Sequence, residues 1–128
     1  MLRRGGWLVL VGNGCSTTGT EPIVHEYNQI LRANANDRAV NFDRYDLSGP
    51  ASRAFASGGM HHAMFCDVVK FTWEEFLGNA LSLSTTPLPG QPDFIAFHEQ
   101  LKMFFEQHKS GNTIGLPMHC EMYVGRLH

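Results

Sequence analysis

Seven histidines and three cysteines are the residues of this chain whose types could ligate a metal or act as nucleophiles. A metal site needs several such side chains to converge at ligand spacing. His61 and His62 are adjacent, so in a strand their side chains point to opposite faces and cannot bind one metal ion together. His119 and Cys120 are adjacent in the same way. The spacing therefore predicts neither a metal ligand nor a catalytic residue.

The three cysteines, Cys15, Cys66 and Cys120, are far apart and show no paired-ligand spacing. Cys66 and Cys120 lie in apolar, strand-like runs, which favours reduced residues in the core. A cysteine–histidine nucleophile pair stays open as an alternative, because such partners need not be close in sequence, although no orienting group can be named for it. This use of cysteine favours a reducing cytoplasm.

A glycine turn, Gly12-Asn13-Gly14, follows an apolar strand and precedes a helix, as the phosphate-binding turns of dinucleotide-binding folds do. The third glycine of that motif should follow three residues later, but Gly19 lies five residues after Gly14. The next acidic residues, Asp43 and Asp46, lie too far along to end the following strand and bind a ribose. We interpret this segment as a plain strand-to-loop turn and assign no cofactor-binding residue to it.

The composition is that of an ordinary globular protein of 128 residues, with 43% hydrophobic and 17% charged residues. This length predicts one domain over residues 1–128. The net charge is −2 and neither sign is clustered, so we expect no nucleic-acid or membrane-surface partner. No apolar stretch reaches the roughly 20 residues that span a bilayer, and no signal-peptide cleavage pattern follows the first apolar run.

The first half of the chain contains two clear elements that would position these residues. An unbroken apolar run from Trp7 to Val11 predicts a strand buried on both faces, as in the middle of a parallel sheet. Residues 20 to about 35 carry one apolar face at helical spacing, with Thr20 as the predicted cap and Pro22 in the first turn. Residues 40–60 give mixed signals, with turn-like or breaking residues at 46–50 and 57–59.

The second half begins with a predicted strand from Ala63 to Phe71. Thr72 and Glu75 form a capping box that starts a helix. A second helix, from Asp93 to about Lys109, has five large apolar side chains on one face, and Gly111 suits the left-handed position after its end.

The last segment, Ile114 to Leu127, alternates with a period of two, which is typical of a strand with one wetter face in antiparallel pairing. Met122 and Val124 fall on the apolar face, while Glu121 and Tyr123 fall on the wetter one. The order strand, helix, strand, two helices, strand predicts an α/β fold with a small mixed sheet of about three strands and helices packed on it.

Seven different short motifs are spread over nearly the whole chain: Leu2-Arg3-Arg4-Gly5-Gly6-Trp7, Val11-Gly12-Asn13, Glu21-Pro22-Ile23 to Leu31, Phe71-Thr72-Trp73-Glu74-Glu75-Phe76-Leu77-Gly78, Ser82-Leu83-Ser84-Thr85-Thr86-Pro87, Phe104-Phe105-Glu106-Gln107-His108 and Val124-Gly125-Arg126-Leu127. In their order and spacing they resemble the carboxyl-terminal half of class I S-adenosylmethionine-dependent methyltransferases of the small-molecule type (type 11-like). Arg4 stands where that family usually has proline, Gly12 where it has tryptophan, and Thr85 where it has tyrosine.

The resemblance implies a partial Rossmann-like methyltransferase fold in which the strand at Trp7 is the fifth of seven. The family's S-adenosylmethionine site lies on its first two strands, which would precede Met1. The resemblance therefore implies a methyltransferase-like fragment without catalytic activity of its own, with no cofactor in the isolated chain, that becomes an enzyme only if an upstream half completes it. Its substrate is not identified.

An alternative is a stand-alone, homo-oligomeric binding module. In the parent sheet the strand from Trp7 to Val11 would be paired on both sides, so one apolar edge is expected to be open and to pair with a second copy. A small-molecule pocket is expected at the strand and helix ends that hold Asn13, Ser84 and Thr85. Simple hydrogen bonding at a helix end is the competing interpretation for Ser82, Ser84 and Thr86.

Overall fold

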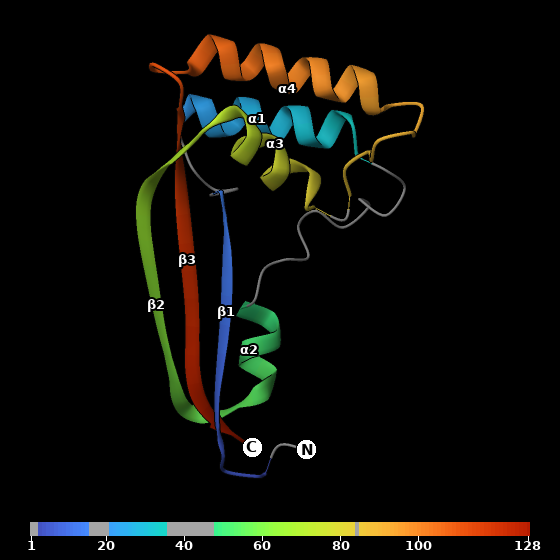
Figure 1. Ribbon diagram of the computed structural model, residues 1–128. Helices are drawn as coiled ribbons and strands as arrows, with labels where there is room; N and C mark the ends of the chain where they lie inside the picture. The colour runs from blue at the N-terminus through green and yellow to red at the C-terminus, as the bar shows by residue number, and fades with distance from the viewer. Residues whose placement is uncertain (1–2, 16–20, 36–47, 84) are drawn as a thin grey trace. The chain divides into compact units, whose positions relative to one another are not determined.

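The computed structural model describes residues 3–15, 21–35, 48–83 and 85–128. The described chain is mixed α/β, as the sequence predicted (Figure 1). Along the chain the elements are β1 (Trp7–Cys15), α1 (Pro22–Ala33), α2 (Ser48–Ala54), β2 (Phe55–Phe71), α3 (Trp73–Leu81), α4 (Phe94–His108) and β3 (Ile114–Leu127).

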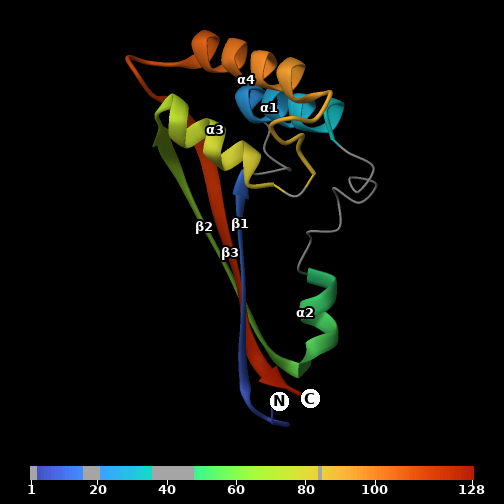
Figure 2. The same cartoon turned by 45° about the vertical axis from the view of Figure 1, so that its right-hand side comes forward.

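The three strands form one sheet in the order β1-β3-β2. β3 lies in the middle and runs opposite to both of its neighbours, as the arrowheads in Figure 2 show. The predicted bounds of β3 and its antiparallel pairing are therefore confirmed. The predicted mixed sheet is wrong for the described strands, because both pairs of neighbouring strands are antiparallel. β1 and β2 are the two edge strands of this sheet.

The chain divides into two compact units, which are described separately. The sheet unit comprises Met1–Gly14, Asp43–Asp67 and Met118–His128, and the helix unit comprises Cys15–Phe42 and Val68–Pro117. The prediction of one domain over residues 1–128 stays a prediction.

A glycine turn starts the sheet unit. The N–H of Gly6 donates to the carbonyl of Arg3 at 3.0 Å, and Gly5 has a φ of 74°, a left-handed conformation that favours glycine. The N–H of Leu127 then donates to the carbonyl of Gly6 at 2.9 Å, which sets Gly6 opposite Leu127. This register places Trp7 across from Arg126, whose guanidinium lies 5.2 Å from the Trp7 ring centroid.

The core of the sheet unit lies on one face of the sheet. Ala51 of α2, Phe55 and Tyr123 are buried together, and Leu8 and Leu10 pack against them. Because side chains alternate along a strand, this core uses the even-numbered residues of β1 and the odd-numbered residues of β3. It is therefore built on the face of β3 that the sequence assigned to solvent.

The helix unit is held by aromatic packing among α1, α3 and α4. The Tyr27 ring lies 5.4 Å from that of Phe76 and 5.7 Å from that of Phe104, measured between centroids. Two polar contacts also join α1 to α4: His108 Nε2 lies 2.8 Å from Glu26 Oε2, and Asn34 Nδ2 donates to Gln100 Oε1 at 2.8 Å.

The ends of these helices follow the predicted signals. The Thr72 hydroxyl accepts from the Glu75 N–H and the Glu75 carboxylate accepts from the Thr72 N–H, which confirms the capping box. Gly111 follows α4 with a φ of 64°, also as predicted. Pro22 is in the first turn of α1, but its cap residue is Glu21, and the predicted cap Thr20 lies outside the described residues.

Three expectations for these elements are corrected. Helix α2 was not predicted, because Gly49 and Pro50 signalled a turn, yet Pro50 lies in the first helical turn, where its missing N–H costs no hydrogen bond. β2 starts at Phe55 instead of Ala63 and continues through Gly58 and Gly59, whose residue type favours a break in a strand. Cys66, expected in the core, is an exposed free thiol, since residues 61–70 of β2 are largely exposed on both faces, and Cys120 is a half-buried one.

None of the described helices is both long and apolar enough to cross a membrane.

Candidate functional site

The three residues of the predicted pocket have different outcomes. Asn13 is exposed near the end of β1 in the sheet unit. Thr85 is buried, with 8% of its surface exposed, in the loop after α3 in the helix unit. Ser84 lies outside the described residues. The pocket that these residues would share stays a prediction.

The hydroxyl groups after α3 bond to the end of that helix. Thr86 Oγ1 donates to the carbonyls of Ala80 and Leu83, each at 3.0 Å, and Ser82 Oγ donates to the carbonyl of Asn79 at 2.6 Å. These bonds satisfy carbonyl groups that a helix end leaves without partners. For Ser82 and Thr86 the structure therefore agrees with helix-end hydrogen bonding.

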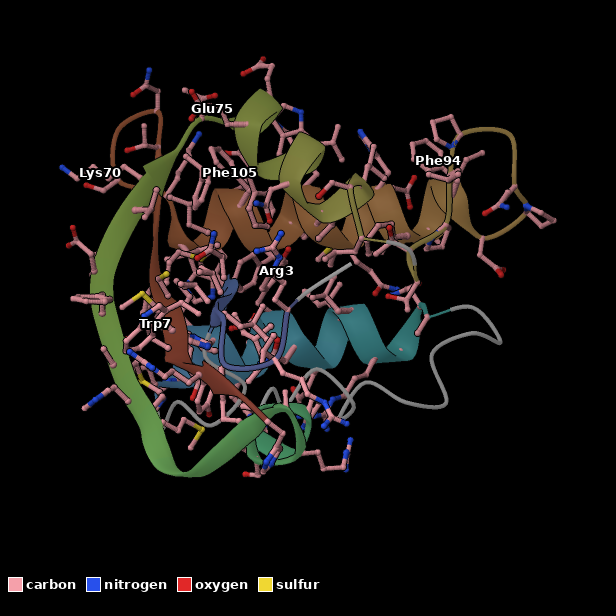
Figure 3. All side chains as sticks on the ribbon, turned by 90° about the horizontal axis from the view of Figure 1, so that it is seen from below. Arg3, Trp7, Lys70, Glu75, Phe94 and Phe105 are labelled. Carbon is pink, nitrogen blue, oxygen red and sulfur yellow. The ribbon has the colours of Figure 1, made fainter. Side chains whose placement is uncertain are left out.

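A large apolar surface is present on β1. Trp7, Val9 and Val11 are 60%, 51% and 55% exposed, although all three belong to the run that predicted a strand buried on both faces. That prediction is wrong for the described chain, since only the face that holds Leu8 and Leu10 packs on a core. Trp7 is labelled in Figure 3, which shows the side chains of the described residues.

The neighbouring strand continues this surface. With Gly6 opposite Leu127, Val9 lies opposite Val124 and Val11 opposite Met122. Val124 and Met122 are half-buried, whereas Tyr123 between them is in the core. We call the surface formed by Trp7, Val9, Val11, Met122 and Val124 the open face.

The open face reverses the expectation from the sequence. Alternation marked Met122 and Val124 as the core side of β3 and Tyr123 as the wetter side, but α2 packs on the Tyr123 side. Full burial of a valine side chain contributes about 1.5–3 kcal/mol. A row of such side chains left in water is a surface that binding to another protein layer would stabilise.

The backbone of β1 adds a second feature beside the open face. Because Gly6 bonds to β3, alternation directs the N–H and C=O groups of residues 8 and 10 toward β3 and those of 7, 9 and 11 away from it. β1 therefore combines an apolar face with an edge whose backbone groups can pair with another strand.

A polar cluster lies on the face of the sheet unit opposite the open face, which is the face that carries Tyr123. Glu121 Oε1 lies 2.7 Å from His62 Nε2 and accepts the Tyr123 hydroxyl at 2.9 Å, while the His62 and Tyr123 rings stack with centroids 4.5 Å apart. A carboxylate that holds an imidazole can orient a general base. Here the same contacts join β2 to β3, which accounts for them structurally. Alternation along β3 predicts that Glu121 and Tyr123 share one face, but it carries no information on their partner His62 on β2.

His119 lies on the same face as Glu121, two residues away. Its Nδ1 atom is buried and has no hydrogen-bond partner among the residues that the structure describes. Leaving a buried polar atom without a partner costs about 1–3 kcal/mol, so such an atom calls for an explanation, a bound ion among them. In the described ranges, no three side chains of histidine, cysteine, aspartate and glutamate come close enough to hold a metal ion by themselves.

The electrostatics of the described residues single out one carboxylate in the helix unit. Hydrogen bonds from Lys109 and then Lys102 hold the pKa of Glu106 below its usual value. Lys102 also lies over the Trp73 ring, 4.4 Å from its centroid. This group of residues lies on the exposed side of α4.

Neither protein-family models nor curated protein sequences give a significant match to this chain. Its function is therefore inferred from its motifs, the order of its strands and the open face.

Proposed function

We propose that this chain is a methyltransferase-like module, similar to the carboxyl-terminal part of a class I S-adenosylmethionine-dependent methyltransferase, that has no cofactor site of its own. On this proposal it has no catalytic activity alone, works in the cytoplasm, and acts in methyl transfer only when a cofactor-binding half completes it.

The order of the elements supports this proposal. Strand, helix, strand, two helices and strand follow one another as the resemblance implies, with α2 as an addition before β2. Mixed sheets, with antiparallel as well as parallel pairs, are common among the large sheets of doubly wound α/β folds. β1 and β2, which both run opposite to β3, are compatible with the end of such a sheet.

The observation that carries the proposal is the open face on an edge strand. In a doubly wound sheet, helices cover both faces, and each inner strand is paired on both sides. β1 has the apolar sequence of such an inner strand, but Trp7, Val9 and Val11 are exposed, and among the strands that the structure describes β3 is its one neighbour. A missing layer and a missing neighbouring strand, supplied by another polypeptide, would account for both features.

Calorimetric titration of the purified chain with S-adenosylmethionine tests this proposal. The expected result is no saturable heat up to millimolar cofactor, with an S-adenosylmethionine-binding methyltransferase in the same buffer as the positive control. Micromolar, one-to-one binding by this chain would contradict the proposal that its cofactor half lies elsewhere.

A second candidate function is a homo-oligomeric interaction module, favoured by the outward backbone groups of β1. Two copies would pair antiparallel through residues 7–11 and so continue the sheet. Val9→Pro removes an outward N–H while leaving the bonds of residues 8 and 10 to β3, because proline is tolerated at such edge positions. Light scattering should give a dimer for the wild type and a lower dimer fraction for Val9→Pro. Equal dimer fractions would exclude this edge as the interface.

A further inference from the structure

Three side chains that could ligate a metal ion, those of Met64, Cys66 and His119, belong to the face of the sheet unit that carries Glu121. Two side-chain contacts between β2 and β3 agree with a single register: His62 pairs with Glu121, and a Cβ added to Gly115 would lie 3.2 Å from Val68 Cγ1. Both contacts belong to one unshifted antiparallel register, in which each step forward on β2 is a step back on β3. That register sets Met64 directly opposite His119.

Cys66 joins this pair because it lies two residues beyond Met64 on the same face. Directly opposite residues have Cβ atoms about 5 Å apart, and diagonal neighbours about 7 Å. A methionine side chain has three rotatable bonds and adapts to fill such a gap. The donor atoms of Met64, Cys66 and His119 can therefore meet at one point above the sheet.

The exposure of each residue fits a binding site better than a packing role. Met64 is 52% exposed and Cys66 is an exposed free thiol, so neither side chain is buried in the core. His119 supplies the complementary observation, a buried Nδ1 atom without a hydrogen-bond partner in the described chain. A bound ion would satisfy that nitrogen.

We propose that Met64 Sδ, Cys66 Sγ and His119 Nδ1 bind one Cu(I) ion. Thiolate and thioether sulfur are soft ligands that select Cu(I), and imidazole also binds copper. On binding, the Cys66 thiol releases its proton to solvent and the sulfur forms the bond to the metal. The ion enters and remains as Cu(I), so no electron is transferred. This site is independent of the methyltransferase-like function.

Zinc fits the same residues less well. Structural zinc takes four ligands from cysteine, histidine and carboxylates. Cys66 and His119 provide two of these, and the described residues hold no cluster of three. The thioether of Met64 is therefore the ligand that favours Cu(I) over Zn(II) at this site.

The test is an anaerobic titration of the full chain with Cu(I) in competition with a chromophoric Cu(I) chelator. Cys15→Ser and Cys120→Ser are introduced together as the background, so that Cys66 is the only thiol. We expect one Cu(I) per chain. Cys66→Ser and His119→Phe should each weaken binding at least tenfold, and Met64→Leu several-fold.

Met60→Leu is the matched control, because Met60 is an exposed methionine of β2 four residues before Met64. It should leave the affinity unchanged, and circular dichroism should confirm that every variant remains folded. The proposal is overturned if the chain does not compete for Cu(I), or if Met64→Leu and Met60→Leu behave alike. It is also overturned by one Cu(I) per two chains, which indicates bridging by two Cys66 thiolates, or by a Zn(II) affinity that exceeds that for Cu(I).

Discussion

Glu121 on β3 lies 2.7 Å from His62 on β2, measured between carboxylate Oε1 and imidazole Nε2. The same oxygen accepts the hydroxyl of Tyr123, a residue of the sheet unit's core. One carboxylate thus joins the two strands and satisfies a hydroxyl group at the edge of the core. The sheet unit depends on this residue more than its half-buried position would indicate.

Glu121→Ala should therefore lower the free energy of unfolding by about 1–2 kcal/mol, because it removes the acceptor for both the Tyr123 hydroxyl and the His62 ring. Urea denaturation followed by tyrosine and tryptophan fluorescence measures this loss. Glu99→Ala, an exposed glutamate of α4, is the control and should stay within about 0.5 kcal/mol of the wild type. Equal effects of the two substitutions would show that the Glu121 contacts contribute nothing.

Gly125 is a position where the backbone approaches its neighbours closely. A Cβ added there would lie 2.6 Å from Phe55 Cδ1 and 2.7 Å from the carbonyl oxygen of Gly59. Gly125→Ala should destabilise the chain by about 1–3 kcal/mol, because the buried Phe55 ring and the β2 backbone must both shift.

Gly78 is the matched control for this substitution. It lies in α3 with nothing within 4 Å of an added Cβ. Gly78→Ala should raise stability by about 0.5–1 kcal/mol, since alanine favours a helix interior. Thermal denaturation of both variants checks the two signs, and destabilisation by Gly78→Ala or none by Gly125→Ala would contradict this packing.

Glu106 gives a prediction for pH dependence. Its pKa is lowered by the hydrogen bonds from Lys109 and Lys102. A carboxylate with a lowered pKa in the folded state adds stability above its unfolded pKa, and this contribution is lost as the pH falls through the folded pKa. Carboxyl-carbon NMR titration should show the pKa of Glu106 rising toward its usual value in Lys109→Gln. An unchanged pKa would mean that Lys109 is not the main cause.

The elements with strong local signals could be predicted from the sequence. The capping box of Thr72 and Glu75, the helix ending before Gly111 and the strand Ile114–Leu127 were all found because local residues specify them. α2 was missed because Pro50 and Gly49 read as a turn, and a helix of seven residues has too few turns to show an apolar period.

The assignment of faces could not be predicted in the same way. Alternation shows that two faces of β3 differ, but which face is buried depends on what packs there. α2 packs on the Tyr123 side, so the more apolar Met122 side became the open face. The register that brings His62 to Glu121 depends on pairing between distant segments, which one strand's sequence does not specify.

The open face is the feature that connects these observations to function. An inner-strand sequence lies on an edge strand with Trp7, Val9 and Val11 in water, and on our proposal this surface is where the chain acts together with another protein. In a sample of the purified chain, the protein that can cover the open face is a second copy of the same chain.

Light scattering of the purified chain at tens of micromolar tests this claim most directly. The wild type should have the mass of a dimer, and Val9→Lys/Val11→Lys should be a folded monomer, because two charges on the open face cannot be buried without partners. Ile95→Lys/Met103→Lys, which changes two exposed apolar residues of α4, should remain a dimer. A monodisperse monomer for the wild type, or a dimer that survives both charges on β1, would contradict the claim that the open face joins a second copy of this chain.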